Sequence, residues 1–395
     1  MSVRQRTWTK PDGTAGLAWV VDYVDQHSKR HLKTFRRKRD ADAYHASTVV
    51  DVRKGVHTAD STSITVAQAG QLWLATSEAN GVERTTLVYY RQHVELHINP
   101  FIGGAKLSQL TAPMVRQFED QLRRDRSPDM VRRVVKSLGT ILSDAVERGL
   151  VAQNVVRAMR VRRRRGKDAH ADQRQRGRLK VGVDIPSPGE IRAIIAHLDG
   201  RWRPLLLTAI FTGLRASELR GLRWADVDLK RKEIHVRQRA DCFNEIGPTK
   251  SAAGERTIPI APMLANTLRE WKLACPKGEL GLVFPNGAGR IENHSNITRR
   301  GLQPVQIAAG VTAGGDGAKY PGLHAFRHFY ASWCINRSVD GGLELPLKVV
   351  QARLGHSSIQ MTADHYGHLF PRGDDGAELA AAEKMFFGRQ KKDRR

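Results

Sequence analysis

The sequence predicts a multidomain, mainly α-helical protein that carries small β-sheets. Strand-like runs rich in β-branched and aromatic residues come before residue 60, and helical periodicity dominates most of the rest. A stretch of dense positive charge with almost no apolar periodicity, residues 157–182, separates two helical regions. A chain of 395 residues is long enough for two to four domains of about 100–200 residues each.

The first domain, residues 1–60, is predicted as a small sheet with one helix. The runs TAGLAWVVDYV and HLKTF are typical of strands, and DQHSKR is typical of the turn between them. A helix that begins near Asp40 should end at Gly55, because glycine accepts the left-handed conformation that ends helices. Its basic residues suit a minor DNA contact, with a solvated basic face as the alternative. These residues are Lys29, Arg30, Lys33, Arg36, Arg37, Lys38 and Arg39.

The second domain, residues 61–160, is predicted as a bundle of about four helices. Thr65 and Gln68 form a capping-box pattern ahead of the first helix. Arg132, Arg133 and Lys136 fall at spacings that share one helix face. A basic linker over residues 161–184 should follow the bundle and contact phosphates.

The third region, residues 185–388, is predicted to be the largest domain, followed by a basic tail at 389–395. It begins with the helical runs SPGEIRAIIAHL and WRPLLLTAIFTGL. KEIHVRQRA and RTIPI are typical of paired strands, with DCFNEIGPTKSAAGE as a long connection between them.

The charge of the chain indicates an anionic partner. A formal net charge of +25 and a pI of about 10.5 favour nucleic acid, with a membrane surface as the weaker alternative. No apolar run approaches the roughly 20 residues of a spanning helix, so we expect a cytoplasmic protein. Cys242, Cys275 and Cys334 are too widely spaced for a disulfide framework or a zinc knuckle, and we expect buried thiols.

Several polar residues of the third region point to phosphate chemistry. Arg215 comes at the start of a helix, and Glu218, three residues later, shares its face and can hold it in place. For RASEL alone, a surface ion pair is the alternative. Lys250 stands in the long connection among small residues that leave it free to reach outward. His324 and Arg327 lie three apart, so an imidazole and a guanidinium can hold one phosphate from the same helix face.

The segment LGHSSIQMTADHYGHLFP carries a further histidine and a tyrosine. His356 follows Gly355 at a turn, and a short helix capped by Ser357 or Ser358 leads to Tyr366. Since a phenol titrates near 10, an attacking tyrosine needs surrounding cations that favour the phenolate. The expected cations are Arg215, Lys250, His324, Arg327 and His356.

The order of five motifs, TGLRASEL, TKSAAGERTIPI, HAFRH, LGHSSIQMT and DHYGHLF, resembles the tyrosine recombinases, the phage-type integrase family of site-specific DNA recombinases. The resemblance covers roughly residues 186–370 and implies an α+β catalytic domain there. It also implies that residues 61–160 bind the core site of DNA. By layout, residues 1–60 resemble the arm-type DNA-binding domain of the family.

The resemblance implies a role for each matching residue. Tyr366 is the nucleophile that attacks a DNA phosphodiester and forms a 3′-phosphotyrosyl bond, which leaves a free 5′-hydroxyl. Arg215 and Arg327 stabilise the phosphoryl charge in the transition state, and Lys250 is the general acid for the leaving oxygen. The base or proton partner of the tyrosine is His324. The remaining residue, His356, donates a hydrogen bond to a phosphate oxygen.

The resemblance also implies the partners and the absence of cofactors. The partners are double-stranded DNA with attachment sites, three further copies in a homotetramer, and accessory directionality or DNA-bending proteins. Neither magnesium nor ATP is needed, because arginines take the place of metal ions and the ester keeps the bond energy. His365 and His368 flank the nucleophile without the companions that zinc prefers, so we expect them to pack or hydrogen-bond around Tyr366 rather than bind a metal.

The sequence leaves two choices open. The main hypothesis is an integrase that integrates or excises a phage or mobile element. The alternatives are a non-catalytic DNA-binding or architectural protein of the same fold and a type IB topoisomerase. The apolar residues Met385, Phe386 and Phe387 near the C-terminus either dock on a neighbouring subunit, as the C-termini of the family do, or pack on their own domain.

Overall fold

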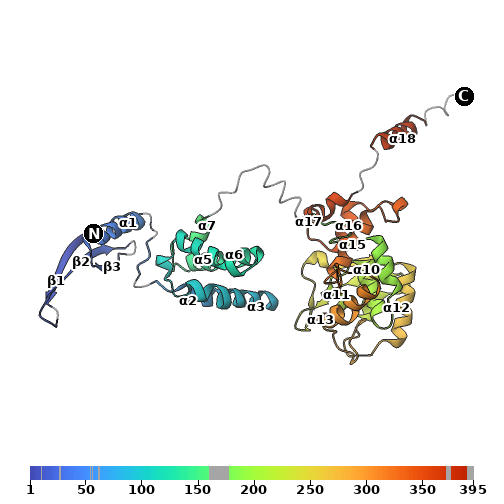
Figure 1. The fold of residues 1–395 in the computed structure, drawn as a ribbon, viewed down its shortest axis with the longest axis horizontal. Coiled ribbons are helices and arrows are strands. Elements are labelled where there is room, and N and C mark those ends of the chain that lie inside the picture. The colour runs from blue at the N-terminus through green and yellow to red at the C-terminus, as the bar shows by residue number, and fades with distance from the viewer. Residues whose placement is uncertain are drawn as a thin grey trace. The chain divides into compact units, whose positions relative to one another are not determined.

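A computed structural model describes residues 1–9, 11–25, 28–53, 55, 57–60, 63–159, 178–370 and 375–388. The chain forms two compact units, residues 1–165 and 166–395 (Figure 1). Most of the predicted linker and the whole of the basic tail at 389–395 lie outside the described residues. Among the helices that the structure does describe, none has the length and apolar character needed to cross a membrane.

The N-terminal part of the first unit is a three-stranded antiparallel sheet with one helix against it. Its elements are β1 (Ser2–Thr9), β2 (Ala15–Val24), β3 (Arg30–Phe35) and α1 (Lys38–Arg53). Its small core is centred on Val21, Tyr23 and Ala41. The sequence predicts β2, β3 and α1 but misses β1, because nearly every β1 residue is exposed and no apolar alternation marks it. The strand forms because its whole length pairs with residues 15–22 of β2.

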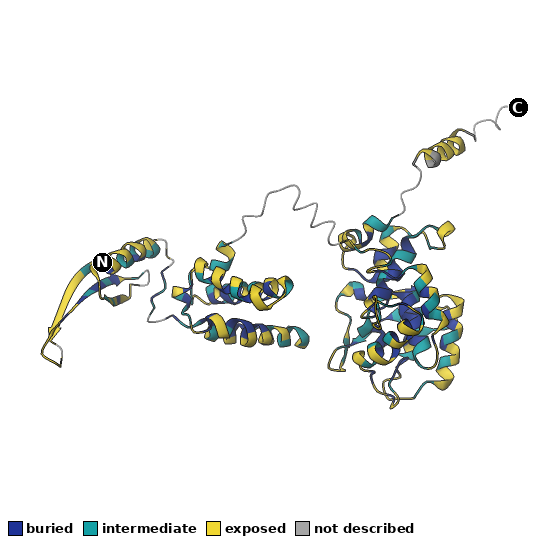
Figure 2. Ribbon diagram, viewed as in Figure 1, coloured by how far each residue is buried: buried dark blue, intermediate teal, exposed yellow. Residues whose placement is uncertain are grey.

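The rest of the first unit is a helical bundle around its own apolar core (Figure 2). Its helices are α2 (Val66–Ala79), α3 (Arg84–Gln92), the π-helical turn η1 (His93–Ile98), α4 (Asn99–Ile102), η2 (Leu107–Gln109), α5 (Ala112–Asp125), α6 (Pro128–Glu147) and α7 (Val155–Ala158). Helix α3 continues through η1 into α4. The predicted capping box is confirmed, since the Thr65 and Gln68 side chains exchange hydrogen bonds with the backbone at the start of α2. Four long helices therefore build the bundle, in agreement with the sequence pattern.

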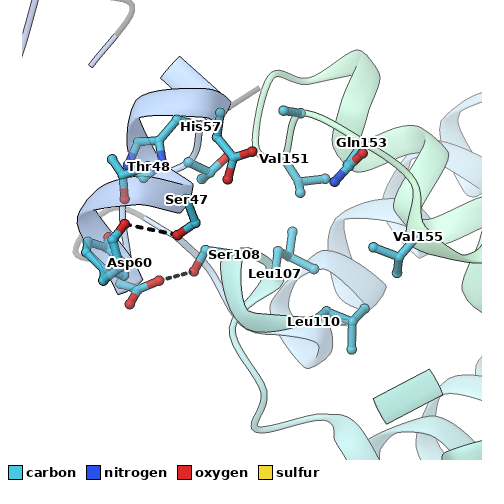
Figure 3. A pocket seen from close by; sticks show the side chains of 14 residues that line it. Ser47, Thr48, His57, Asp60, Leu107, Ser108, Leu110, Val151, Gln153 and Val155 are labelled. Carbon is cyan, nitrogen blue, oxygen red and sulfur yellow. Dashed lines mark hydrogen bonds between the residues drawn. The ribbon is translucent and has the colours of Figure 1, made fainter. Parts of the chain in front are cut away.

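Asp60 ties the segment after α1 to the bundle. Its Oδ1 accepts a hydrogen bond of 2.6 Å from Ser108 Oγ, as Figure 3 shows, and its other carboxylate oxygen pairs with Lys33 of β3. Beside this contact lies a cavity of about 200 Å³ lined by α1, η2 and the segment before α7. Burial opposes the charge of Asp60, but the hydrogen bonds and the Lys33 ammonium still hold its pKa below the usual value. This carboxylate therefore fastens the sheet region to the bundle.

The second unit is mainly helical around one large core and carries two small antiparallel sheets. Its helices are α9 (Pro188–Ala196), α10 (Trp202–Thr212), α11 (Ala216–Gly221), η3 (Trp224–Asp226), η4 (Ala252–Gly254), α12 (Pro262–Ala274), α13 (His294–Asn296), η5 (Ile297–Leu302), α14 (Gln303–Ala308), α15 (His324–Ile335), η6 (Ser338–Asp340), α16 (Leu347–Leu354), α17 (Ile359–Tyr366), η7 (Gly367–Leu369) and α18 (Asp375–Gly388). Its strands are β4 (Val227–Asp228), β5 (Glu233–Val236), β6 (Gln238–Ala240), β7 (Ile246–Pro248) and β8 (Arg256–Pro259).

The strands of the second unit differ in part from the prediction. The expected pairing is present as β5 with β8, in the antiparallel order β4-β5-β8. The predicted connection, however, contains a strand of its own, because β6 and β7 form a separate hairpin. Arg237, between β5 and β6, is where the run KEIHVRQRA changes from one sheet to the other.

The expectation of three buried thiols is wrong for two of them. Cys334 is buried on α15, but Cys275 is only half-buried and Cys242 is exposed. Cys242 lies in the turn of the β6–β7 hairpin, which sequence periodicity did not reveal.

Candidate active site

Arg215 is fixed at the junction between α10 and α11. Helix α10 ends at Gly213, which has φ 61°, and a Cβ atom there would lie 2.5 Å from the Tyr330 ring. The turn places Arg215 at the N-cap of α11, where its Nη1 donates to Glu218 Oε1 at 2.7 Å. Glu218 is only 3% exposed, so this pair is a buried one and not the surface ion pair considered as the alternative.

Glu218 holds a second arginine from another part of the chain. Arg256, at the start of β8, donates from Nη2 to Glu218 Oε2 at 2.8 Å and from Nη1 to Oε1 at 3.1 Å. Burial alone would raise the pKa of Glu218, but Arg256 and Arg215 together bring it below its ordinary value. Arg256 also donates to the Arg353 carbonyl at 2.7 Å, which connects β8 to the end of α16.

Arg327 is the most deeply placed cation of the group. It is 2% exposed on α15, and its Nη1 and Nη2 donate to the carbonyls of Gly213 at 2.7 Å and Leu354 at 2.5 Å. Burial lowers its pKa to about 10, which still leaves it charged at neutral pH. Arg215 Nη2 donates to the next carbonyl, that of Gly355, at 3.1 Å. The two guanidinium groups are thus anchored on consecutive carbonyls of one turn.

His356 follows that turn directly. Gly355 ends α16 with φ 65°, as the sequence predicts for a turn at this position. The Nδ1 atom of His356 lies 2.9 Å from Thr362 Oγ1, and its carbonyl accepts a hydrogen bond of 2.9 Å from Gln351 Nε2. Burial, followed by the charges of the two arginines, lowers the pKa of His356 to about 3, so its ring is neutral.

Tyr366 is the last residue of α17, whose N-cap is Ser358. It is 2% exposed, and its ring stacks on that of His356 at a centroid distance of 6.3 Å and an angle of 2°. Burial raises its pKa to about 12, although the charges of Arg327 and Arg215 act in the opposite direction. Of the expected cations, Arg327 and Arg215 are therefore the ones that act on the pKa of Tyr366, whereas His324 and His356 are neutral, and the phenol keeps its proton.

The histidine that contacts the tyrosine hydroxyl is not the expected one. His328 Nδ1 lies 2.7 Å from Tyr366 Oη, whereas His324 contacts His328 edge to face at a centroid distance of 4.5 Å. His324 is solvent-exposed, and its pKa is lowered by partial burial of the ring and by Arg327 and Arg215. Both histidines lie on α15 four residues apart, so one face carries them both. The histidine within hydrogen-bond distance of the Tyr366 hydroxyl is therefore His328 and not His324.

Lys250 stands apart from the other predicted site residues. It is exposed in the loop between β7 and β8, and the structure records no hydrogen bond or ion pair from its ammonium to another described residue. The structure thus gathers five of the six predicted side chains and leaves Lys250 at the surface. The loop ends at η4 and then Arg256, so Lys250 is connected to the site through the Arg256–Glu218 pair.

The two histidines that flank Tyr366 lie differently. His368 Nε2 donates to the Leu179 carbonyl at 2.8 Å, which joins η7 to the segment before α9. His365 is exposed, with its ring centroid 6.2 Å from that of Tyr366.

The sequence motifs already contain two further residues of the site, His328 and Arg256. His328 is the last letter of HAFRH, and its spacing of four from His324 was a usable signal. Arg256 follows the Lys250 loop within TKSAAGERTIPI, but nothing local connects it to Glu218, 38 residues earlier.

The arrangement suits the attack of a phenol on a phosphate ester. Two immobilised guanidinium groups can stabilise charge on phosphoryl oxygens, and neutral imidazoles can donate or accept a proton beside them. A buried phenol with a raised pKa needs an acceptor for its proton when it attacks. The site therefore has the elements of covalent phosphoryl transfer.

The chain is similar to known recombinases in sequence and in structure. Residues 187–372 match the phage integrase family. A "Tyrosine recombinase XerC-like" protein of Caldanaerobacter subterraneus subsp. tengcongensis is 27% identical over 379 residues, which cover 88% of this chain and 90% of that protein.

The structural comparisons agree with the sequence comparisons in fold. The integrase of the Tn1549 transposon, in complex with a circular intermediate DNA, has a TM-score of 0.61 at 16% identity, covering 82% of this chain and all of that one. A lambda integrase tetramer bound to a Holliday junction has a TM-score of 0.56 at 16% identity, covering 89% and 95% of the two chains. Residues 187–372 therefore form a phage integrase domain, and the fold of the chain is that of the integrases with which it was compared.

Proposed function

We propose that this protein is a site-specific DNA recombinase, an integrase that cleaves and rejoins DNA strands to integrate or excise a phage or other mobile element. The observation that carries the proposal is the anchoring of Arg215 and Arg327 on the consecutive carbonyls of Gly355 and Leu354, beside the buried phenol of Tyr366. Two guanidinium groups held this rigidly act on a phosphate without reorganising as charge develops on it.

The roles of the site residues follow from their chemistry. Tyr366 Oη attacks the phosphorus of a DNA phosphodiester, and the 3′-phosphotyrosyl bond forms as the bond to the 5′-oxygen breaks. Arg215 and Arg327 stabilise the phosphoryl oxygens, while His324 and His356 donate hydrogen bonds to them. Lys250 protonates the leaving 5′-oxygen once its loop closes on the bound DNA. Since Tyr366 is 2% exposed, binding of DNA must also open a path to its hydroxyl.

The DNA partners are attachment sites in duplex DNA. The net charge of +25 and the exposed arginines of α5 and α6 favour phosphate contacts by the bundle at the core site. Residues 1–60 would bind a separate arm-type site through the sheet and its basic residues. Active complexes would be homotetramers, with accessory directionality or DNA-bending proteins, and would act on DNA in the cytoplasm of a bacterial host.

Helix α18 is proposed to join these subunits. Its Met385, Phe386 and Phe387 are 78%, 78% and 59% exposed, and such a patch is usually covered by a partner. Truncation after Arg372 should therefore weaken assembly of the tetramer on DNA, as measured by gel mobility and mass photometry. Unchanged assembly would remove the helix from this role.

The central experiment is recovery of DNA that becomes covalently joined to the protein. The full chain is incubated with sheared genomic DNA from its source organism, denatured with detergent and precipitated, and the attached 3′ ends are sequenced. One recurring sequence is expected, and a nicked synthetic duplex of that sequence should then accumulate the adduct with wild-type protein and not with Tyr366→Phe.

The same assay separates the alternatives. An architectural protein would bind the duplex and yield no adduct with any DNA. A type IB topoisomerase would yield adducts without a recurring sequence and would relax supercoiled plasmids that lack the site.

A further inference from the structure

The hydroxyl of Tyr366 has a defined hydrogen-bond partner that the family-based assignment of roles does not include. His328 Nδ1 lies 2.7 Å from Tyr366 Oη, within the distance at which a base removes a proton. The two rings are 5.7 Å apart between centroids and inclined by 57°. The contact joins α15 to the end of α17, so tertiary packing and not local sequence creates it.

His328 is positioned by residues that also form the phosphate site. Arg327, its neighbour on α15, is bound to the Gly213 and Leu354 carbonyls and fixes this turn of the helix. His324 contacts the His328 ring edge to face and stands at the solvent side. A histidine on a helix turn this firmly anchored has little freedom to leave the hydroxyl.

At neutral pH the phenol carries the proton and the imidazole can accept one. Burial lowers the pKa of His328 to about 4, and His324 and Arg327 lower it further. Burial raises the pKa of Tyr366 to about 12. At neutral pH the imidazole therefore has a lone pair and the phenol has its proton. The groups that face His328 are His324 and Arg327 of α15, His365 and Tyr366 of α17, and Asp184 before α9.

We propose that His328 is a catalytic residue, the base that accepts the proton of Tyr366 as the nucleophile attacks DNA. This inference rests on the proposed function. As the Oη–phosphorus bond forms and the phosphorus–O5′ bond breaks, the Tyr366 proton passes to His328 Nδ1 and the Lys250 proton passes to O5′. In the rejoining step the 5′-hydroxyl attacks phosphorus and gives its proton to Lys250, and Oη recovers its proton from His328.

This assignment leaves His324 free for the phosphate. His324 is exposed and lies three residues before Arg327 on the same face, so it can donate to a phosphoryl oxygen beside the guanidinium. The two histidines of HAFRH then have different tasks, one toward the substrate and one toward the nucleophile.

The test measures single-turnover adduct formation on the nicked duplex found with the wild-type protein. His328→Ala should slow the reaction by about 100-fold or more, the usual contribution of a general base. A second substrate carries sulfur in place of the bridging 5′-oxygen and needs no general acid. On this substrate the rate of adduct formation by Lys250→Ala should recover, whereas the rate of His328→Ala should remain low. His197→Ala is the matched control, since it removes an exposed histidine at the end of α9 and should react at the wild-type rate.

Two further measurements separate a base from a residue that only supports the fold. Added imidazole should restore much of the His328→Ala rate by entering the vacated space, and the variant rate should rise with pH toward the ordinary phenol pKa of about 10. His328→Asn, which keeps much of the side-chain volume, should be as slow as the alanine variant and should bind the duplex normally.

Several outcomes would overturn the proposal. Wild-type rates in both His328 variants would do so, as would faster reaction, which would make the contact a lock on the nucleophile. A slow variant with no imidazole rescue and an unchanged pH profile would reduce His328 to a structural residue. Failure of the wild-type protein to form any adduct would instead reject the proposed function itself.

Discussion

Arginine side chains of the helical bundle and of the candidate active site lie in different surroundings. In the helical bundle, the side chains of Arg123, Arg132 and Arg133 are 62%, 76% and 63% exposed and pair only with carboxylates of their own helices. In the second unit, the Arg256 side chain is 5% exposed and Arg327 is 2% exposed, and each binds backbone carbonyls from distant segments. Mobile surface charges attract a polyanion of any sequence, whereas immobilised charges can be aimed at one phosphate. Under the proposed function, the exposed arginines contribute affinity for DNA and the buried ones contribute to catalysis.

The largest effect should come from the carboxylate between the buried arginines. Glu218→Gln leaves Arg215 and Arg256 close together without their counter-charge, so we expect a loss of roughly 3 to 5 kcal/mol in the unfolding free energy of the second unit. Hydrogen exchange in increasing urea, read by mass spectrometry for each unit, measures it. Glu119→Gln, which removes the carboxylate between Arg116 and Arg123 on α5, is the control and should cost under about 1 kcal/mol. Equal losses of unfolding free energy in the two variants would show that the arginines of the site and those of the bundle do not differ in this way.

The next effect concerns geometry at constant charge. Arg327→Lys keeps a cation but cannot reach the Gly213 and Leu354 carbonyls together, so adduct formation should slow by about 100- to 1000-fold, or about 3 to 4 kcal/mol. Single-turnover cleavage at saturating protein measures this rate. Arg132→Lys on α6 should leave it unchanged, and an active Arg327→Lys protein would show that charge alone suffices.

Acid should affect the second unit through its neutral histidines. The pKa of His356 is about 3 in the folded protein, whereas an unfolded histidine has a pKa near 6.5. The unfolded state therefore binds a proton that the folded state does not as the pH falls below about 6.5, and the folded state loses stability. At pH 5 the loss is on the order of 2 kcal/mol for such a buried group. Urea unfolding at several pH values above 4.5, where Glu218 stays ionised, should show a slope that His356→Asn flattens. An unchanged slope would mean that His356 is not neutral in the folded site.

A smaller effect is expected where the bundle passes into the segment after it. Asn154 caps α7 by accepting from the amides of Val156 and Arg157, and its Nδ2 donates to the Gly139 carbonyl at 2.6 Å. Asn154→Ala should lower the unfolding free energy of the first unit by about 1 to 2 kcal/mol. Asn154→Asp keeps the acceptor oxygen, so it should lose less unfolding free energy than the alanine variant in the same urea experiment. A neutral alanine variant would show that the cap is dispensable.

The smallest effect on stability, with a clear effect on binding, belongs to the exposed arginines. Arg132→Ala and Arg133→Ala should change stability by under about 0.5 kcal/mol, because surface ion pairs contribute little. Each should reduce the slope of log affinity against log salt by about 1 if it contacts one phosphate. Fluorescence anisotropy with the site duplex between low and moderate salt checks this. Unchanged slopes would move the DNA contact to another face.

Local features of the molecule were accessible from the sequence because they depend on neighbours within four residues. The Thr65–Gln68 capping box, the Arg215–Glu218 pair and the turn at Gly355 are all of this kind. Strand β1 was missed because its exposed residues carry no alternation, and strand β7 was hidden inside an apparent loop. Both strands exist only through pairing with another segment, which periodicity in one segment does not report.

The candidate site shows the same limit at the level of single side chains. HAFRH places His324, Arg327 and His328 on neighbouring positions of α15, and helix geometry alone cannot say which histidine meets a tyrosine 38 residues later. The exposed position of Lys250 and the bridge from Arg256 to Glu218 were equally inaccessible, since each depends on how β8 packs against α11 and α16.

The order of the motifs along the chain was enough to predict the phage integrase domain at residues 187–372 and the side chains that its proposed chemistry uses. Packing of α15 against α10, α16 and α17 then determined which of those groups touch, which are neutral and which remain at the surface. The physical reason is that spacing sets the direction of a side chain within one helix, whereas burial and hydrogen bonding depend on atoms contributed by segments far away in sequence.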